Sequence, residues 1–405
     1  MKLFGEEPGM DDVFLNILND CVNNKENVGI SARITHKGKD IFRGAAGYAD
    51  KEKGIPFTCD NLVRIFSMTK LITGVAALML FEKGCYSLDE PLYKYLPAFK
   101  DLKVITYARD GRLVLSPAKN HVTIRNIFTM TAGFSYHILF TPYDVPKSFT
   151  DARRLSAEIL EKTARTPNLT SEQMIEAIAT IPMPFEPGTA WLYGVCSDIL
   201  AALVAAISKK TFGAYLKEEI FDPLGMKDTC YRPTKEQLER LAVMYDYSDP
   251  KNVVPYDTSA FNIEHSPGST NEHFVGALFS TLDDFSAFLQ MLAAGGTYGG
   301  RRLIGENTIK LMASDQLTEE QYACLKSTKY PEGHSTWGLM CRVTKSLNNV
   351  QPYLFPGSFG WAGWAGTQAA VDPGRELTLT MMVQRVPSFS LNVMSKLMQT
   401  AYGMI

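Results

Sequence analysis

The sequence predicts an α+β fold: an antiparallel sheet built from both chain ends and flanked by helices, with an inserted, mostly helical domain. Three observations predict it. Strand-like segments occur near the N-terminus and again after residue 360, the segments between them have mainly helical patterns, and no Gly/Ser linker divides the chain. The two ends must therefore share one sheet. We expect a discontinuous sheet domain, residues 1–84 and 270–405, and a helical domain, residues 85–269.

Size and composition indicate an ordinary globular protein. With 405 residues, 45% apolar and 21% charged, the chain can bury a substantial core, which excludes disorder, collagen and coiled coil. The 41 basic and 43 acidic residues give a net charge of −2, so we expect neither a nucleic-acid nor a membrane partner.

The sequence also favours a cytoplasmic location. No secretory signal is visible in MKLFGEEPGMDD, and the longest apolar run, residues 71–81, is far below the ~20 residues that span a bilayer. The seven cysteines are scattered without a CxxC, as expected for free thiols in a reducing cytosol. No metalloprotease, P-loop or dinucleotide motif is present. Although Glu264-His265 and Glu272-His273 flank one loop, we expect no metal and no cofactor.

The N-terminal elements are predicted to be a helix followed by a hairpin. Residues 11–23 carry apolar side chains at helical spacing. Residues 29–36 and 41–49 form two strands around a turn at residues 37–40, and residues 62–65 are extended.

A long helix is predicted next, from Ser67 to Lys83, with Gly84 at its C-terminal end. Residues 71–81 are apolar on every side, and a helix that is apolar all round is buried. The most hydrophobic helix therefore lies in the centre of the protein, with Ser67 at its N-terminal end.

The remaining elements are predicted from capping residues and turn signals. Helices should follow four capping side chains: Thr123 (ending at Gly133), Thr170 with Gln173, Ser197 (over 198–209) and Thr281 with Asp284 (ending near Gly295). The chain should end in two strands, residues 360–371 and 376–383, joined by the turn 372–375 and followed by a helix over 390–402.

Ser67 and Lys70 are the first candidates for chemistry. On a helix, positions three apart share a face, so the lysine amine can reach the serine oxygen. A serine hydroxyl becomes a nucleophile when a nearby base takes its proton. Burial lowers the pKa of a lysine, so that its neutral amine can serve as this base. Alone, this spacing also fits a capping serine and a surface lysine. Its place at the start of the most apolar helix favours the catalytic interpretation.

Residues 64–74, RIFSMTKLITG, resemble the active-site block of the serine β-lactamase and penicillin-binding-protein superfamily. The likeness is greatest to the branch that holds class C β-lactamases and family VIII carboxylesterases. It extends over about residues 20 to 385. Further blocks agree in order: 122–133, 185–193, 222–226, 279–284 and 357–373.

The resemblance implies that Tyr193 is the third catalytic residue. A phenol beside a lysine ammonium should have a lowered pKa, so that it accepts the serine proton and passes it to the leaving group. The family pattern is Tyr-x-Asn, whereas this chain has Tyr193-Gly194-Val195. The missing Asn weakens any expectation of penicillin-like amide recognition.

The family's third motif corresponds to Trp361-Ala362-Gly363. The resemblance implies that the amides of Ser67 and Trp364 form the oxyanion hole. A tryptophan replaces the lysine that can bind a β-lactam carboxylate, as in family VIII esterases. We expect the substrate to be contacted by Trp361, Gly363, Tyr136 and Phe359, with residues 136–149 as a mobile pocket wall, although such aromatics also serve as core.

We therefore expect a serine hydrolase that cleaves small-molecule carboxylic esters through an acyl-enzyme on Ser67, with Lys70 and Tyr193 transferring protons. Short acyl chains are implied by the family likeness. Three alternatives remain open: a β-lactamase or D-amino-acid peptidase, an acyltransferase that uses the same site, and a non-catalytic binding protein on the same scaffold. The sequence does not indicate an oligomeric state.

Overall fold

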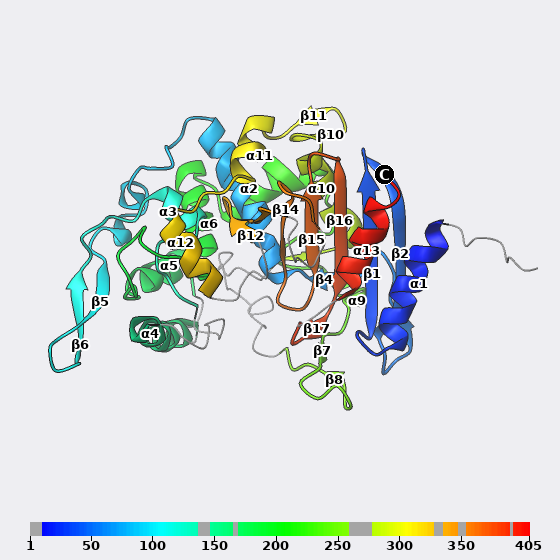
Figure 1. Cartoon of the computed structure of the whole chain (residues 1–405), viewed down its shortest axis with the longest axis horizontal. Coiled ribbons are helices and arrows are strands. Elements are labelled where there is room, and N and C mark those ends of the chain that lie inside the picture. The colour runs from blue at the N-terminus through cyan, green and yellow to red at the C-terminus, as the bar shows by residue number, and fades with distance from the viewer. Residues whose placement is uncertain are drawn as a thin grey trace, which may run out of the picture.

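An eight-stranded antiparallel sheet occupies the right-hand part of the computed structural model in Figure 1. The structure describes residues 10–136, 146–164, 169–258, 278–327, 335–346, 354–388 and 392–405. The strand order is β12-β13-β14-β15-β16-β1-β2-β3. In chain order these strands are β1 Gly29–His36, β2 Lys39–Asp50, β3 Ile55–Pro56, β12 Ser335–Trp337, β13 Arg342–Thr344, β14 Phe359–Ala362, β15 Gln368–Asp372 and β16 Leu377–Val383.

The two chain ends meet at the pairing of β1 with β16, which runs from Ile30 opposite Val383 to His36 opposite Leu377. Every residue of β16 is buried, as expected for a strand covered on both faces. The prediction of an antiparallel sheet from both ends of the chain is confirmed.

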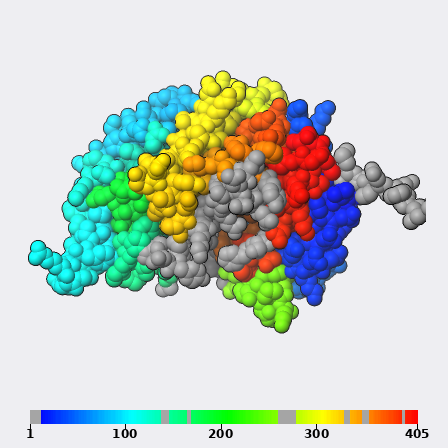
Figure 2. Space-filling view, viewed as in Figure 1, coloured from blue at the N-terminus to red at the C-terminus, as the bar shows by residue number. Residues whose placement is uncertain are grey.

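Helices cover both faces of this sheet. The terminal helices α1 (Met10–Asn23) and α13 (Asn392–Tyr402) contact each other and share a small apolar core with one face. Figure 2 shows them side by side, in blue and red. On the other face, α10 (Leu282–Ala293) packs on β1, β15 and β16. The predicted long helix is α2 (Thr69–Glu82), which contacts β14 and belongs to the main core.

Beyond α2 lies a mostly helical region whose helices are short or medium in length. Helix α6 (Cys196–Ser208) packs directly on α2. The other helices among the described residues are α3 Ile124–Phe128, α4 Lys147–Ala164, α5 Ser171–Ala179, α7 Phe212–Leu216, α8 Asp222–Leu224, α9 Lys235–Glu239, α11 Glu306–Met312 and α12 Glu319–Ser327, with a π-helical turn at Lys217–Phe221 and 3₁₀ turns at Phe66–Met68, Leu92–Lys94 and Pro97–Phe99. The division at residues 84/85 and 269/270 stays a prediction.

Short strands complete the fold. A hairpin that the sequence analysis did not predict, β5 (Lys103–Tyr107) with β6 (Leu113–Pro117), extends from the far end of the helical region in Figure 1. The remaining strands are β4 Val63–Arg64, β7 Tyr245–Asp246, β8 Val254–Pro255, β9 Phe279–Ser280, β10 Thr297–Tyr298, β11 Arg301–Arg302 and β17 Arg385–Val386. Within the described ranges, no single helix is long and apolar enough to cross a membrane; α6 and Phe212–Leu224 reach that length only as a pair bent by 77°.

The strand predicted over residues 360–371 is wrong. The chain instead folds back on itself, so that β14 and β15 pair antiparallel, with Trp361 opposite Ala369. In the turn between them the Gly363 amide donates to the Thr367 carbonyl at 2.8 Å, and Gly366 has a φ of 90°. The chain reversal needs a residue in the left-handed conformation, which glycine adopts readily. Because β14 and β15 are both largely buried, residues 360–371 have the apolar pattern of a single strand.

Two helix boundaries also differ from the prediction. The capping boxes at Thr123 and Thr170 are confirmed, but the helix after Thr123 ends at Phe128 rather than Gly133, because Met130 turns left-handed with a φ of 59°. Helix α6 begins at Cys196, so Ser197 lies inside it and caps nothing.

Candidate active site

Ser67 lies on a tight turn between strand β4 and the buried helix α2. The residue before it, Phe66, has a φ of 44°, a left-handed conformation that is rare for a bulky side chain. Its ring packs edge-on against Trp364, at 5.4 Å between centroids, which holds the strained turn in place. From residue 61 to residue 70, every side chain is buried except that of Ser67. The turn therefore presents this one hydroxyl to solvent.

Lys70 stands beside that hydroxyl at the base of the site. Its Nζ is 3.1 Å from the Oγ of Ser67 and 3.1 Å from the hydroxyl of Tyr136, and the lysine is 0% exposed. Burial lowers the pKa of Lys70 to about 7, against an opposing pull from the negative charge of Asp198. The amine is thus neutral in a large fraction of molecules near neutral pH and can accept a proton.

Tyr193 completes the group that the sequence analysis selected. Its hydroxyl accepts a hydrogen bond from the Trp361 indole at 3.0 Å and also hydrogen-bonds to Ser67. The Lys70 ammonium position lies 4.8 Å from the centre of the Tyr193 ring. The structure therefore brings together Ser67, Lys70 and Tyr193, which come from segments over a hundred residues apart.

The predicted lowering of the Tyr193 pKa is wrong. Burial raises the pKa of this phenol well above its usual value, and the hydrogen bonds from Ser67 and Trp361 offset only part of the increase. The expectation assumed a permanent ammonium beside the phenol. Because Lys70 is itself fully buried and its pKa is lowered, that charge is not permanent.

Tyr136 lies within the same group of side chains. Its hydroxyl accepts a hydrogen bond from Lys70 and its ring lies 5.5 Å from that of Tyr193, and its predicted role as a substrate contact stays a prediction. Ser135 pairs with Gly194 in an isolated β-bridge, which fixes Tyr136 beside Tyr193. Of the predicted pocket wall, residues 137–145 lie outside the described residues, so that expectation stays a prediction.

Three buried tryptophan side chains pack around the ring of Tyr193. Trp361 and Trp337 cross at 4.6 Å and 89°, and both contact the Tyr193 ring, at 5.4 and 6.1 Å. Trp191 stacks on the same ring at 6.3 Å and crosses Trp337 at 5.6 Å. Trp337, which the sequence analysis did not single out, donates its own indole N–H to the Phe128 carbonyl at 3.1 Å.

The turn after β14 packs directly against the chain that leads to Ser67. A Cβ on Gly363 would lie 2.1 Å from the Thr367 Oγ1 and 2.5 Å from the Ile65 carbonyl oxygen. Only glycine fits at this position, because a side chain would collide with Thr367 and with the backbone of Ile65. This contact supports the predicted pairing of the Ser67 and Trp364 amides as an oxyanion hole, which stays a prediction. Phe359, 1% exposed, lies in the main core, and its role as a substrate contact also stays a prediction.

Gly363→Ala is therefore expected to displace the turn and misplace Ser67. We expect the free energy of unfolding to fall by about 1–3 kcal/mol and kcat for ester hydrolysis to fall by about tenfold or more. Urea unfolding and initial rates check both values. Gly374→Ala is the matched control, since a Cβ there meets only the Asp372 side chain at an ordinary 3.4 Å. Equal effects of the two substitutions would contradict this role of Gly363.

Asp198 is a further charged group that sequence reasoning missed. It lies in the first turn of α6, is 4% exposed, and its charge raises the pKa of Lys70, Tyr136 and Tyr193. The signal was present in the sequence, because a lone carboxylate at the start of a helix with the sequence CSDILAALVAAIS is unusual.

Metal chemistry gains no support from the part of the chain that the structure describes. There, no group of three or more His, Cys, Asp or Glu side chains could hold an ion. The acidic and histidine pairs at residues 264–265 and 272–273 lie outside the described residues.

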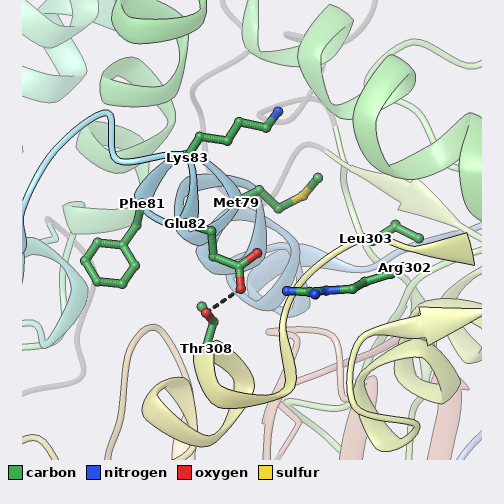
Figure 3. A pocket seen from close by; sticks show the side chains of 7 residues that line it. All are labelled: Met79, Phe81, Glu82, Lys83, Arg302, Leu303 and Thr308. Carbon is green, nitrogen blue, oxygen red and sulfur yellow. Dashed lines mark hydrogen bonds between the residues drawn. The ribbon is translucent and has the colours of Figure 1, made fainter.

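A hollow lies at the other end of α2, about 20 Å along the helix axis from Ser67 (Figure 3). There Glu82 accepts hydrogen bonds from the Gly305 amide at 2.7 Å and the Thr308 hydroxyl at 2.5 Å. Glu82 thus ties α2 to the start of α11. Its carboxylate already serves the fold, and we assign no chemistry to this hollow.

A serine and a lysine at the start of a buried helix, beside strand β14 of an antiparallel sheet, define a serine hydrolase with a β-lactamase-like fold. The chain belongs to the β-lactamase family: the family model described as Beta-lactamase matches residues 14–401. The resemblance found from the sequence motifs is thereby confirmed.

Three similar proteins show the range of this family. Protein Rv1367c of Mycobacterium tuberculosis is 28% identical over 372 residues, 90% of this chain and 87% of that protein. Esterase EstB of Burkholderia gladioli is 29% identical over 237 residues, 58% of this chain and 55% of the esterase. The solved structure of EstCE1, described as a hydrolase with promiscuous acyltransferase activity, superposes with a TM-score of 0.78 at 19% identity, over 96% of this chain and 98% of EstCE1.

Proposed function

We propose that the protein hydrolyses small carboxylic esters through an acyl-enzyme on Ser67. One observation carries the proposal: a partly exposed serine hydroxyl lies 3.1 Å from a fully buried lysine amine whose pKa is lowered to about 7. This pair supplies a nucleophile and a base at neutral pH. Esterase EstB, a relative, supports esters as the substrate class.

In the proposed reaction, the Oγ of Ser67 forms a bond to the ester carbonyl carbon as its proton leaves. The carbonyl oxygen becomes an oxyanion held by the amides of Ser67 and Trp364. Lys70 and Tyr193 together carry the proton from the serine to the departing alcohol. Water then attacks the acyl-enzyme by the same route, which releases the carboxylic acid and restores Ser67.

Trp361 favours esters over β-lactams. The strand position that can carry a carboxylate-binding cation holds instead a buried indole, whose N–H is used by Tyr193. An uncharged donor that already binds the protein gives no electrostatic anchor for a β-lactam carboxylate.

Acyl transfer to a small alcohol or amine is the second candidate, since EstCE1 is described as a hydrolase with promiscuous acyltransferase activity. All seven cysteines are free, which supports the cytoplasmic location predicted from the sequence.

A panel of p-nitrophenyl esters of increasing chain length, assayed beside a chromogenic cephalosporin, tests this proposal. We expect turnover of the acetate and butyrate esters, a decline of kcat/KM with longer acyl chains, and much slower opening of the cephalosporin. Product analysis with an added alcohol separates hydrolysis from acyl transfer. Fast turnover of the cephalosporin with weak ester cleavage would favour a β-lactamase over an esterase. If no ester were turned over, the proposed function would be wrong.

A further inference from the structure

The two segments that would supply the oxyanion donors touch each other through their backbones. The proposed donors are the amides of Ser67 and Trp364, and the residues just before them meet at the carbonyl oxygen of Ile65. A Cβ on Gly363 would lie 2.5 Å from that oxygen, and the Thr367 hydroxyl donates to it at 3.4 Å. A shift of either segment would therefore change the distance between the two donors.

Three aromatic side chains beside these donors also pack on one another. The rings of Phe66 and Trp364 meet edge to face, with 5.4 Å between centroids and 76° between ring planes. The ring of Tyr256 packs on Trp364 in the same manner, at 5.7 Å and 83°. All three belong to, or pack against, a small apolar cluster that is separate from the main core. We call these three side chains the aromatic clamp.

We propose that the aromatic clamp positions the amides of Ser67 and Trp364 at the spacing that a single oxyanion requires. The inference rests on the proposed ester chemistry. It adds three positioning residues, Phe66, Trp364 and Tyr256, whose side chains act through the two backbone amides.

The backbone of Phe66 explains why its side chain must be held. A peptide unit is planar, so the dihedral angles of Phe66 set the direction in which the Ser67 N–H points. The φ of Phe66 is 44°, in the left-handed region that a bulky side chain occupies only at an energetic cost. The ring is 7% exposed and packs on Trp364, and this packing opposes a return to an ordinary φ. Loss of the ring should therefore let the Ser67 amide turn away.

The second donor is held from another side by the small sheet of β17, β7 and β8. The Arg385 amide in β17 donates to the Ala365 carbonyl at 2.9 Å. Directly after β8, the Tyr256 amide donates to the Met244 carbonyl at 2.8 Å, and the Tyr256 ring packs on Trp364. The turn that carries the second donor is thus fixed between this sheet and the turn before α2.

The donors matter at one step of the proposed reaction. As the Oγ of Ser67 bonds to the carbonyl carbon and loses its proton, the π electron pair of the carbonyl moves to its oxygen. Two N–H groups stabilise this new charge well only when both lie about 2.7–3.1 Å from it. A loosened clamp should therefore slow the cleavage of the ester without changing the nucleophile or its base.

A thionoester, in which sulfur replaces the carbonyl oxygen, isolates this contribution. Sulfur is larger than oxygen and is a weak hydrogen-bond acceptor, so donors spaced for an oxyanion stabilise it little. The serine and its proton transfer serve both substrates. Misplaced donors should lower kcat/KM for the ester more than for the thionoester, whereas partial unfolding or a displaced Ser67 should lower both equally.

The test compares p-nitrophenyl butyrate with its thiono analogue in Phe66→Leu and Phe42→Leu. Phe42 is the matched control, since its buried ring also makes a ring contact, with Phe14 at 5.1 Å, but in the small terminal core. For Phe66→Leu we expect kcat/KM to fall about 10- to 100-fold on the ester and less than about threefold on the thionoester. Phe42→Leu should leave the ratio of the two values within about twofold of the wild type.

Phe66→Gly separates the effect of the ring from that of the backbone. Glycine adopts the left-handed conformation readily, so this variant removes the backbone strain together with the ring. We expect the ester-to-thionoester ratio to fall as it does in Phe66→Leu. A wild-type ratio in Phe66→Gly would show that the φ alone positions the amide, which would overturn the role of the clamp.

The remaining outcomes also decide the inference. Equal losses on both substrates in Phe66→Leu would overturn it, and so would a wild-type protein that cleaves the ester and the thionoester at similar rates. Melting curves show which variants are folded. If neither Phe66 variant is folded, Tyr256→Leu carries the test, with an expected loss of about 3- to 10-fold on the ester alone, and equal losses there have the same meaning. If the wild-type protein cleaves neither substrate, it is the proposed function that fails.

Discussion

Ser67→Ala is expected to remove ester hydrolysis, with kcat falling by at least about 10³-fold. The substitution deletes the Oγ that Lys70 and Tyr193 both approach, and no other atom. Because this side chain is partly exposed, the free energy of unfolding should change by less than about 1 kcal/mol. Initial rates on a short-chain ester, with urea unfolding beside them, measure both quantities.

A matched control is available on the other face of the sheet. Ser395, on the C-terminal helix α13, belongs to the region around the small terminal core rather than the site. Ser395→Ala should leave kcat within about twofold of the wild-type value, since it touches none of the reacting groups. If Ser67→Ala retained activity within tenfold of the wild type, Ser67 would not be the nucleophile.

Lys70→Met is expected to produce the second large loss. The buried amine must be neutral to take the serine proton, so wild-type kcat/KM should rise with pH and reach half its plateau near the Lys70 pKa of about 7. Below that pH the lysine is protonated and activity declines. In the variant we expect kcat/KM to fall by about 10³-fold or more and this pH dependence to disappear.

The same substitution should make the protein more stable at neutral pH. Lys70 has a pKa of about 7 when folded, against 10.5 as its ordinary value. Between these values the unfolded chain binds a proton that the folded chain does not, so this lysine makes the free energy of unfolding increase with pH. Its unfavourable contribution is full below about pH 7 and is gone above 10.5.

Replacing this lysine by an apolar side chain of similar length removes that cost. Urea unfolding at several pH values between about 7 and 10.5 should therefore show a more stable variant at the lower end, with a flatter pH dependence. Two results would contradict the assignment of this amine as the neutral base. One is a Lys70→Met protein that is less stable than the wild type at pH 7, and the other is a variant whose kcat/KM still rises with pH near 7.

Several parts of this fold were predictable because they depend on local pattern. Helix α2 is apolar on every side, and the strands at both chain ends alternate or run apolar as sheet strands do. The Thr123 and Thr170 capping boxes use side chains that bond their own backbone three residues on, so the sequence alone specifies them.

Other parts depend on tertiary contacts that no local pattern records. The sequence pattern predicts strand through the turn at residues 363–367, because both arms around that turn are buried in the same sheet. The hairpin of β5 and β6 differs from these parts, because it does carry a local signal: Asp110-Gly111 lies at its tip, a turn sequence between two strand-like stretches.

The candidate site also combines features that local sequence predicts with features that depend on tertiary contacts. Ser67 and Lys70 lie three residues apart, a spacing that a helix brings to one face, and the family likeness indicates Tyr193. The bond from Tyr136 to Lys70, the bond from Trp361 to Tyr193 and the raised pKa of Tyr193 depend on burial and on contacts between distant segments. Sequence motifs identified which residues meet, whereas their protonation and hydrogen-bond direction required the three-dimensional arrangement.

The most direct test of the central claim is to trap the acyl-enzyme and locate it. The protein is mixed with p-nitrophenyl butyrate and quenched in acid within the first turnover, and the intact mass and the peptide map are measured. The account predicts one added butyryl group per chain, on the peptide that contains Ser67, and no added mass in Ser67→Ala. An acyl group on any other side chain, or hydrolysis that proceeds with no adduct under conditions where deacylation limits turnover, would contradict it.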